Sequence, residues 1–147
     1  MKKIMFICHG NICRSPMAEF VMKDLVKKAG REKDFFIDSA ATSTEEIGND
    51  IYPPAKRKMV EKGIPFSSHY ARQIRKSEYD EWDLFICMDS YNVRNLTRIF
   101  GHDNKNKIKK LLDYSKGGDV ADPWYTGNFE LTYLDVLDGC SKLLEKE

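Results

Sequence analysis

The stretch IMFICHGNICRSPMAE, residues 4–19, holds an apolar run, a short polar loop and the start of a helix in direct succession. The segment KIMFI, residues 3–7, forms a continuous apolar run, which predicts a strand covered on both faces. Ser15 predicts a helix N-cap, and Pro16 suits the first helical position. A buried strand that leads through a tight loop into a helix is typical of a βαβ unit, so the stretch favours a parallel sheet.

The rest of the chain continues this alternation of strands and helices. Gly30 closes the first helix. The further predicted elements are strands at 35–40, 83–89 and 107–113, helices at 55–64, 90–100 and 129–145, a helical turn near 74–82, and loops at 42–54 and 114–128. Segment 107–113 could instead begin a helix. No linker or repeat divides the chain, so we expect one α/β domain over residues 1–147, with helices on both faces of a parallel sheet.

Composition and charge exclude several classes of function. The chain has 147 residues, of which 41% are hydrophobic and 32% charged, as in ordinary globular proteins. The formal net charge is +1 and no basic tract occurs, which argues against nucleic acid as a partner. No apolar segment approaches the ~20 residues that span a bilayer, and the N-terminal apolar run is too short for a secretory signal. We therefore expect a cytoplasmic protein with no membrane or nucleic acid partner.

The cysteines are more consistent with free thiols than with disulfides or a metal site. Four occur, Cys8, Cys13, Cys87 and Cys140, and without a secretory signal the default is that they stay reduced. No pair has the C-x-x-C spacing, and the three histidines are scattered along the chain. We expect no metal and no cofactor.

The loop from Cys8 to Arg14 carries the pattern that points to chemistry. It follows a predicted parallel strand directly, and ligands bind outside the carboxyl ends of such strands. A tight loop that enters a helix aims backbone N–H groups inward, and the helix dipole adds partial positive charge. The Arg14 guanidinium matches two oxygens of a phosphate, and the same positive surroundings favour the thiolate form of Cys8. The nucleotide-binding patterns G-x-x-x-x-G-K-[ST] and G-x-G-x-x-G are absent.

A second candidate lies in the segment ADPWY, residues 121–125. Attack of a thiolate on phosphorus needs a proton for the departing oxygen, and Asp122 could supply it as a general acid. An Asp-Pro pair by itself usually marks only a turn. Trp124 and Tyr125 could belong to the core, or they could form a slot for an aromatic ring.

These motifs together resemble those of the low-molecular-weight protein tyrosine phosphatases. The resemblance covers essentially the whole chain and rests on CHGNICRSPMAE at 8–19, DSAATS with EIGN at 38–49, SSHYARQI at 67–74, FICMD at 85–89 and DPWY at 122–125. It implies a four-stranded parallel sheet flanked by helices, a metal-independent hydrolase, and phosphotyrosine-containing proteins as substrates. We expect the protein to act as a monomer.

The resemblance implies a chemical role for three residues. Cys8 corresponds to the nucleophile that forms a phosphocysteine intermediate. Arg14 corresponds to the residue that binds the phosphate and stabilises its transition state. Asp122 corresponds to the acid for the leaving phenol, and then to the base that activates water.

The resemblance also implies supporting positions around the loop. Asn11 and Ser15 match residues that shape it, and the Ser15 hydroxyl would support the sulfur of Cys8 as a leaving group. Ser39 and His69 match positions that brace the loop by hydrogen bonds, although His69 could also be an ordinary core histidine. The candidate phosphate-binding loop consists of His9, Gly10, Asn11, Ile12, Cys13 and Ser15.

Two positions near the candidate site leave alternatives open. Cys13 matches a neighbour that can form a reversible disulfide with the nucleophile, or it is a small buried residue. Glu45 departs from the family pattern, in which an aromatic or other bulky residue commonly occupies the rim of the cleft. If Glu45 lines the cleft with Trp124 and Tyr125, its charge would weaken acidic substrates; otherwise it is a solvated loop carboxylate. His9 is given no catalytic part.

Three other functions stay open from the sequence. Arsenate reductases resemble this fold and share the loop, but they need two further cysteines close in sequence on a mobile segment. Here Cys87 lies in an apolar strand and Cys140 in the last helix. Protein arginine phosphatases resemble one another in having threonine where this chain has Ile12. A noncatalytic phosphoprotein-binding module would need neither the Cys8 thiol nor Asp122.

Overall fold

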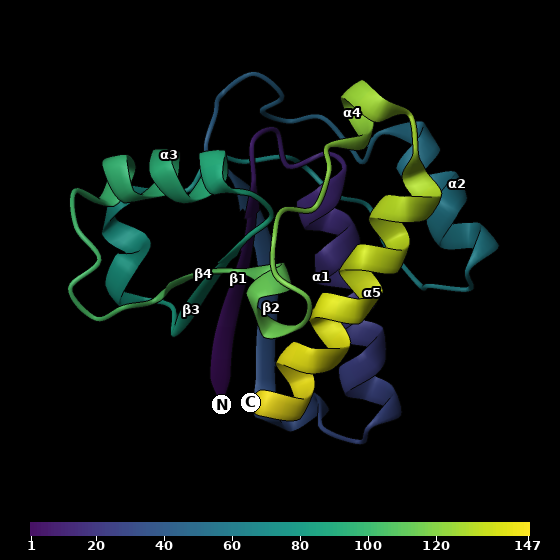
Figure 1. Ribbon diagram of the computed structural model, residues 1–147, viewed down its shortest axis with the longest axis horizontal. Coiled ribbons are helices and arrows are strands. Elements are labelled where there is room, and N and C mark those ends of the chain that lie inside the picture. The colour runs from purple at the N-terminus through teal and green to yellow at the C-terminus, as the bar shows by residue number, and fades with distance from the viewer.

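The computed structural model describes residues 1–147, and its centre is a sheet of four parallel strands (Figure 1). The strands are β1 (Lys2–Cys8), β2 (Phe35–Ala41), β3 (Leu84–Cys87) and β4 (Ile108–Lys110). They lie in the order β2-β1-β3-β4, and every neighbouring pair is parallel. The chain passes from β1 to β2 on one side of β1, and then crosses to β3 and β4 on the other side. The carboxyl end of β1 is therefore the point at which the winding reverses, where ligands bind in open α/β sheets.

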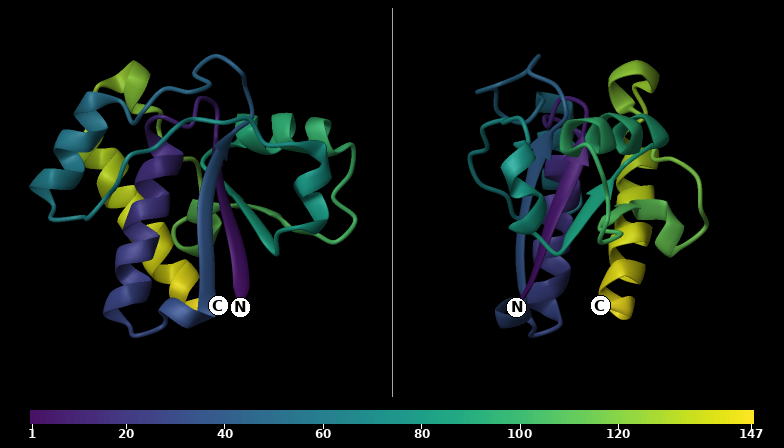
Figure 2. Two further views of the ribbon diagram at one scale, coloured as in Figure 1. Left: turned by 180° about the vertical axis from the view of Figure 1, so that it is seen from behind. Right: turned by 90° about the vertical axis from the view of Figure 1, so that its left-hand side faces the viewer.

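Helices cover both faces of the sheet (Figure 2). The α-helices are α1 (Arg14–Lys28), α2 (Pro53–Glu61), α3 (Ser90–Phe100), α4 (Pro123–Thr126) and α5 (Phe129–Lys146), and the 3₁₀ helices are Glu32–Asp34, Lys76–Asp80 and Leu111–Tyr114. None of them combines the length and the apolar character needed to cross a membrane. The fold is the expected α/β arrangement of a four-stranded parallel sheet between helical layers.

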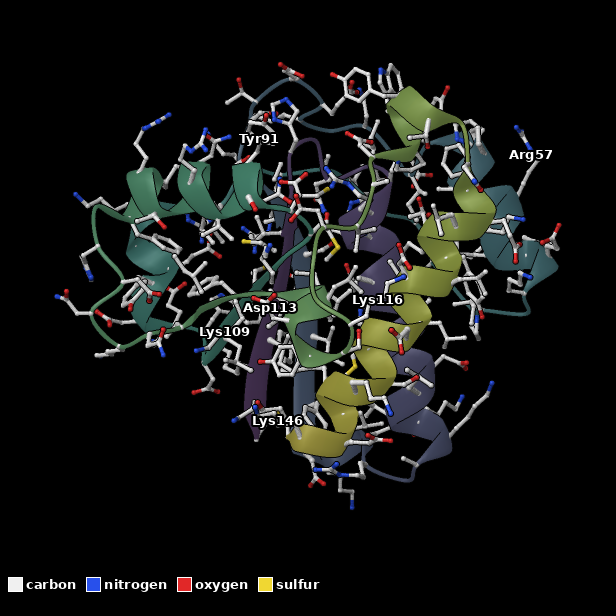
Figure 3. The ribbon with its side chains drawn as sticks, in the orientation of Figure 1. Arg57, Tyr91, Lys109, Asp113, Lys116 and Lys146 are labelled. Atoms are coloured by element: carbon white, nitrogen blue, oxygen red, sulfur yellow. The ribbon has the colours of Figure 1, made fainter.

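The alternation of side chains along β1 explains the two layers. Ile4 and Phe6 are fully buried in the larger core, against α1, α2 and α5. Met5 and Ile7 are fully buried in a second core on the opposite face, against α3. A strand segment that is buried on both faces must be apolar at every position, as IMFI at residues 4–7 is. Polar side chains such as that of Arg57 on α2 project into solvent (Figure 3).

Most predicted elements occur with shifted ends. The helix predicted at 55–64 begins at Pro53, because proline suits the first turn of a helix. Of the strand predicted at 107–113, only 108–110 pairs with β3, and the chain then turns into a 3₁₀ helix that buries two leucines. The loop predicted at 114–128 contains the four-residue helix α4.

The predicted cap of α1 is wrong. The helix begins at Arg14 with Cys13 as its N-cap, no side chain caps it, and Pro16 is the third helical residue. The hydroxyl of Ser15 lies instead 2.9 Å from the sulfur of Cys8. The first N–H groups of α1 are thus left without a side-chain cap, which suits a helix end that faces a ligand.

Candidate active site

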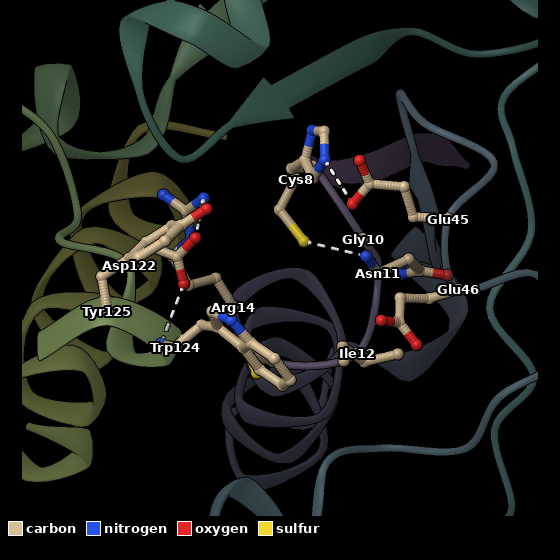
Figure 4. Close-up of a pocket in the computed structure, with 12 residues that line it drawn as sticks. Cys8, Gly10, Asn11, Ile12, Arg14, Glu45, Glu46, Asp122, Trp124 and Tyr125 are labelled. Carbon is tan, nitrogen blue, oxygen red and sulfur yellow. Dashed lines mark hydrogen bonds and ion pairs between the residues drawn. The ribbon is translucent and has the colours of Figure 1, made fainter. Parts of the chain in front are cut away.

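The loop from Cys8 to Arg14 lies where the winding of the sheet reverses, and it forms one side of a pocket (Figure 4). The pocket lies at the carboxyl ends of the strands. The side chains and loop atoms that line it belong to Cys8, His9, Gly10, Asn11, Ile12, Cys13, Arg14, Glu45, Glu46, Asp122, Trp124 and Tyr125. The structure thus brings together two segments that are more than a hundred residues apart in the sequence.

Backbone N–H groups of this loop are available to an anion. Asn11 has a left-handed backbone with φ of 60°, which asparagine tolerates better than most residues. A left-handed residue in such a loop directs successive N–H groups toward one point and creates an anion-binding nest. The N–H groups of Gly10, Ile12 and Cys13 donate to no acceptor in the protein. Together with the start of α1, the loop favours a bound phosphate.

Two hydrogen-bond donors reach the sulfur of Cys8. The Asn11 N–H donates to Cys8 Sγ at 3.2 Å, and Ser15 Oγ lies 2.9 Å from it. Ser15 Oγ already accepts a bond from Asn11 Nδ2 at 2.7 Å, so the hydroxyl proton is free for the sulfur. Donors in this position stabilise a thiolate, which is the nucleophilic form of cysteine.

A buried network holds Asn11 in its left-handed conformation. Asn11 Nδ2 also donates to Ser39 Oγ at 3.0 Å, and Ser39 Oγ donates to Glu19 Oε1 at 2.6 Å. On the other side, His69 Nε2 donates to the Asn11 carbonyl oxygen at 2.8 Å. A carboxylate can only accept, so Glu19 orients the Ser39 hydroxyl to accept from Asn11. Ser39 and His69 therefore contact the loop from behind and lie outside the pocket.

Arg14 is held rigidly at the base of the pocket. It is 3% exposed, and its Nη1 donates to Asp89 Oδ2 at 2.7 Å and to the Val120 carbonyl oxygen at 2.9 Å. Nη2 lies 3.5 Å from Asp122 Oδ2. Burial lowers the pKa of Arg14, but the Cys8 sulfur and the two carboxylates raise it more, so the net shift is upward. The guanidinium stays charged at every physiological pH, with one nitrogen bound by the protein.

Asp122 begins the short helix α4 and faces the same pocket. Its Oδ1 accepts the Trp124 N–H at 3.0 Å, which makes it the N-cap of α4. The Trp124 ring packs on Tyr52, with ring centroids 4.8 Å apart. The Tyr52 N–H in turn donates to the Ile12 carbonyl oxygen at 2.9 Å. Tyr52 thus links α4 to the loop from Cys8 to Arg14.

The walls of the pocket differ in chemistry. Trp124 and Tyr125 are 52% and 84% exposed, so they belong to the pocket rim and not to the core. Figure 4 places both with Asp122 on the side opposite Glu45 and Glu46. The exposed faces of these two rings can pack against an aromatic ring that enters the pocket.

The other wall is polar. Glu45 Oε2 accepts the Nε2–H of His9 at 2.9 Å, and both side chains are well exposed. Glu46 Oε2 accepts a bond from Asn49 Nδ2 at 2.6 Å. Glu45 therefore lies at the rim of the cleft.

The thiols of Cys13, Cys87 and Cys140 are buried and protonated at neutral pH. Burial, followed by the nearby Cys8 sulfur, raises the pKa of Cys13 to about 12. Burial also raises the pKa of Cys87 and of Cys140, and both are completely inaccessible. All four cysteines are free thiols. No three His, Cys, Asp or Glu side chains gather in a group that could hold a metal ion.

Three carboxylates of the site were missed by the sequence analysis. Asp89 holds Arg14, Glu19 ends the network behind the loop, and Glu46 lines the pocket. Asp89 follows the buried strand β3, whose carboxyl end lies beside that of β1, so its position after an apolar run was a usable signal. Glu19 lies one helical turn after Ser15, which places both on the same face of α1.

Comparisons with known proteins identify relatives over the whole length of the chain. The sequence profile described as low molecular weight phosphotyrosine protein phosphatase matches residues 3–147. The chain is 40% identical over 147 residues to the low molecular weight protein-tyrosine-phosphatase YfkJ of Bacillus subtilis, covering 98% of this chain and 94% of the relative. It is 41% identical over 151 residues to the human low molecular weight phosphotyrosine protein phosphatase, and the match covers 99% of this chain and 95% of the human protein. The crystal structure of YfkJ superposes on this chain with a TM-score of 0.95, and the match covers 99% of this chain and 94% of the YfkJ chain.

Proposed function

The chain belongs to the low molecular weight phosphotyrosine protein phosphatase family, and from this membership we propose that it hydrolyses phosphotyrosine in proteins through a phosphocysteine intermediate on Cys8. The observation that carries the proposal is the position of the Cys8 sulfur. It lies between two hydrogen-bond donors in a pocket that also contains Arg14 and Asp122. A nucleophile, an oxyanion-binding group and a proton carrier are the components of covalent phosphoryl transfer.

In the first step, the thiolate of Cys8 attacks phosphorus while the bond between phosphorus and the tyrosine oxygen breaks. The phosphoryl group passes to the sulfur. The loop N–H groups and the guanidinium of Arg14 stabilise the charge on the three other phosphoryl oxygens. Asp122 gives its proton to the departing oxygen, so that tyrosine leaves as a neutral phenol.

In the second step, water replaces the sulfur. The Asp122 carboxylate takes a proton from a water molecule, whose oxygen attacks phosphorus while the sulfur–phosphorus bond breaks. The sulfur leaves as a thiolate, and the Asn11 N–H and the Ser15 hydroxyl stabilise it. Inorganic phosphate is released, and Asp122 is again protonated. Three residues outside the pocket act as positioning residues. Ser39 and His69 hold Asn11 by hydrogen bonds, and Glu19 holds Ser39.

The buried positions of Cys87 and Cys140 argue against the arsenate reductase alternative. A thiol relay needs accessible partners, and both thiols are completely buried, Cys87 in β3 and Cys140 in α5. Ile12 on the pocket wall supports phosphotyrosine over phosphoarginine as the substrate, because its branched apolar side chain suits a flat ring. The intact Cys8 and Asp122 favour an enzyme over a binding module.

Peptide substrates test the proposal. The wild-type enzyme should prefer phosphotyrosine over phosphoserine, phosphothreonine and phosphoarginine in kcat/KM. We expect a preference of ~10-fold or more, because burial of a ring contributes ~1.5–3 kcal/mol and aromatic contact adds ~0.5–1.5 kcal/mol. Phosphoserine and phosphothreonine are too short to reach the loop past Trp124 and Tyr125. The measurement is kcat/KM on four peptides that differ only in the phosphorylated residue.

Two variants serve as controls for this selectivity. Replacing Trp124 and Tyr125 together with alanine should reduce the preference, mainly by weakening phosphotyrosine turnover. Ile12→Thr should raise phosphoarginine turnover relative to phosphotyrosine. Equal wild-type turnover of phosphoserine and phosphotyrosine peptides would mean that the aromatic wall does not select the substrate.

Oxidation should inactivate the enzyme reversibly. Peroxide converts the Cys8 thiolate to a sulfenic acid, and Cys13 is the nearest resolving thiol in sequence; its attack releases water and forms a Cys8–Cys13 disulfide. In Cys13→Ala the sulfenic acid has no resolving thiol, and further peroxide oxidises it to the sulfinic acid, which dithiothreitol does not reduce. We therefore expect dithiothreitol to restore activity in wild type and in Cys140→Ala, but not in Cys13→Ala. Mass spectrometry of the oxidised enzyme identifies the pair. Full recovery of Cys13→Ala, or a disulfide from Cys8 to Cys87 or Cys140, would show that Cys13 does not have this role.

A further inference from the structure

The pocket mouth has an acidic wall whose charge the protein leaves largely uncompensated. Glu45 and Glu46 form this wall, opposite the rings of Trp124 and Tyr125 (Figure 4). Neither carboxylate has a lysine or arginine partner: Glu45 is bonded to His9 and Glu46 to Asn49. Other carboxylates of the chain are paired with lysine, as Asp119 is with Lys110 at 3.0 Å.

The only lysine or arginine that lines the pocket is Arg14. It is buried at the base, and Asp89 already neutralises part of its charge at 2.7 Å. On the wall opposite the aromatic rings, the mouth above it therefore carries the carboxylates of Glu45 and Glu46 against the single imidazole of His9, which makes this wall acidic. Arg14 and the loop N–H groups compensate a phosphate bound at the base, so the charges of Glu45 and Glu46 are left for a cationic group of the substrate to pair with.

The acidic wall lies directly beside the loop that contains Gly10. The Glu46 side chain packs directly over the loop, since a β-carbon added to Gly10 would lie 3.3 Å from Glu46 Cγ. The side chain of Glu45 is 68% exposed, which leaves its carboxylate accessible from solvent. A carboxylate accepts up to about four hydrogen bonds, so Glu45 can bind a second donor while it keeps His9.

We propose that Glu45 and Glu46 select phosphotyrosine segments that carry a lysine or arginine directly beside the phosphotyrosine. This inference rests on the proposed phosphatase activity and adds the chemistry of the substrate flank. The ammonium or guanidinium group of the flanking residue pairs with the acidic wall when the ring lies between the walls. Segments with flanking aspartate or glutamate are repelled.

Three phosphotyrosine peptides with flanking lysine, alanine or glutamate residues test the proposal. At low ionic strength, kcat/KM should decrease in that order, with a lysine-to-glutamate ratio of about three to ten, as two exposed ion pairs produce. At about 1 M salt the ratio should approach one, because the screening length shortens to ~3 Å. The measurement is kcat/KM for each peptide at both ionic strengths.

A double variant identifies the residues responsible. Glu45→Gln with Glu46→Gln removes the charges but keeps amide oxygens that can accept from His9 and Asn49, and it should reduce the ratio to within about twofold of one. The matched control is Glu81→Gln, an exposed carboxylate near the amino end of β3, at the far end of the sheet. This control should keep the wild-type ratio.

Binding to the Cys8→Ser variant separates this inference from the proposed function. The lysine-flanked phosphopeptide should bind more tightly than the glutamate-flanked one, and the unphosphorylated lysine peptide should bind weakly. Equal kcat/KM for all three phosphopeptides, with normal turnover of p-nitrophenyl phosphate, would overturn the inference alone. An unchanged ratio in the double variant would also overturn it, as would equally tight binding of the unphosphorylated peptide. Absence of turnover of every substrate would overturn the proposed function and the inference together.

Discussion

Replacing Cys8 with serine should lower kcat for p-nitrophenyl phosphate by about 10⁴-fold or more, as loss of a covalent nucleophile does in other enzymes. A serine hydroxyl needs a base to become a nucleophile, but Asp122 is protonated in the first step, and the Asn11 N–H and Ser15 Oγ that surround the sulfur do not supply one. The loop N–H groups and Arg14 remain, so inorganic phosphate should still bind with nearly the wild-type affinity. Steady-state kinetics and phosphate titration measure the two effects.

The matched control is Cys140→Ala, which removes a buried thiol from α5 without touching the pocket. Its activity should stay within about twofold of wild type, because that thiol packs in the core away from the pocket and its hydrogen bond to the Ala18 carbonyl oxygen, at 3.8 Å, is weak. EDTA should leave the wild-type rate unchanged. Substantial turnover by Cys8→Ser, or loss of wild-type activity in EDTA, is incompatible with covalent metal-independent catalysis.

Replacing Asp122 with asparagine should slow the hydrolysis of phenyl phosphate by about 10²–10⁴-fold. The size of the effect should follow the need of the leaving group for a proton. Aryl phosphates with very acidic phenols should therefore be slowed much less in the phosphorylation step. Asparagine is as good an N-cap as aspartate, so this variant keeps the bond to the Trp124 N–H that begins α4.

The comparison of Asp122→Asn with Asp122→Ala separates the two roles of this residue. Alanine removes both the proton carrier and the cap, which costs about 1 kcal/mol of local stability. If the acid role is correct, both variants should show the same dependence on the leaving group. A uniform loss across the aryl phosphate series, or near-wild-type activity of Asp122→Asn, would mean that Asp122 only caps α4.

The architecture of the fold could be predicted because its signals are local. The uninterrupted apolar run of β1 indicates burial on both faces, and strands that alternate with helices indicate a parallel sheet. The errors lie where a competing interaction is nonlocal. Ser15 has the sequence pattern of a cap, but its hydroxyl is bonded to Cys8 and Asn11. The strand at 107–113 ends after Lys110 because Leu111 and Leu112 are drawn into the core.

The candidate site was only partly predictable for the same reason. The loop residues are contiguous, the segment ADPWY indicated Asp122, and the resemblance added Ser39 and His69. The ion pair between Arg14 and Asp89 joins residues 75 positions apart, and no sequence pattern pairs them. The uncompensated charge of Glu46 likewise depends on which lysines lie nearby, which only the folded chain defines.

The most direct test of the account is detection of the phosphoenzyme. Rapid-quench mass spectrometry of the wild-type enzyme during turnover of p-nitrophenyl phosphate should show one added phosphoryl group, located on Cys8 by fragmentation of the peptide that spans residues 4–14. The Cys8→Ser variant should show none under the same conditions. A phosphoryl group on His9 or Cys13, or turnover with no phosphoenzyme under conditions that make its breakdown rate-limiting, would contradict covalent catalysis on Cys8.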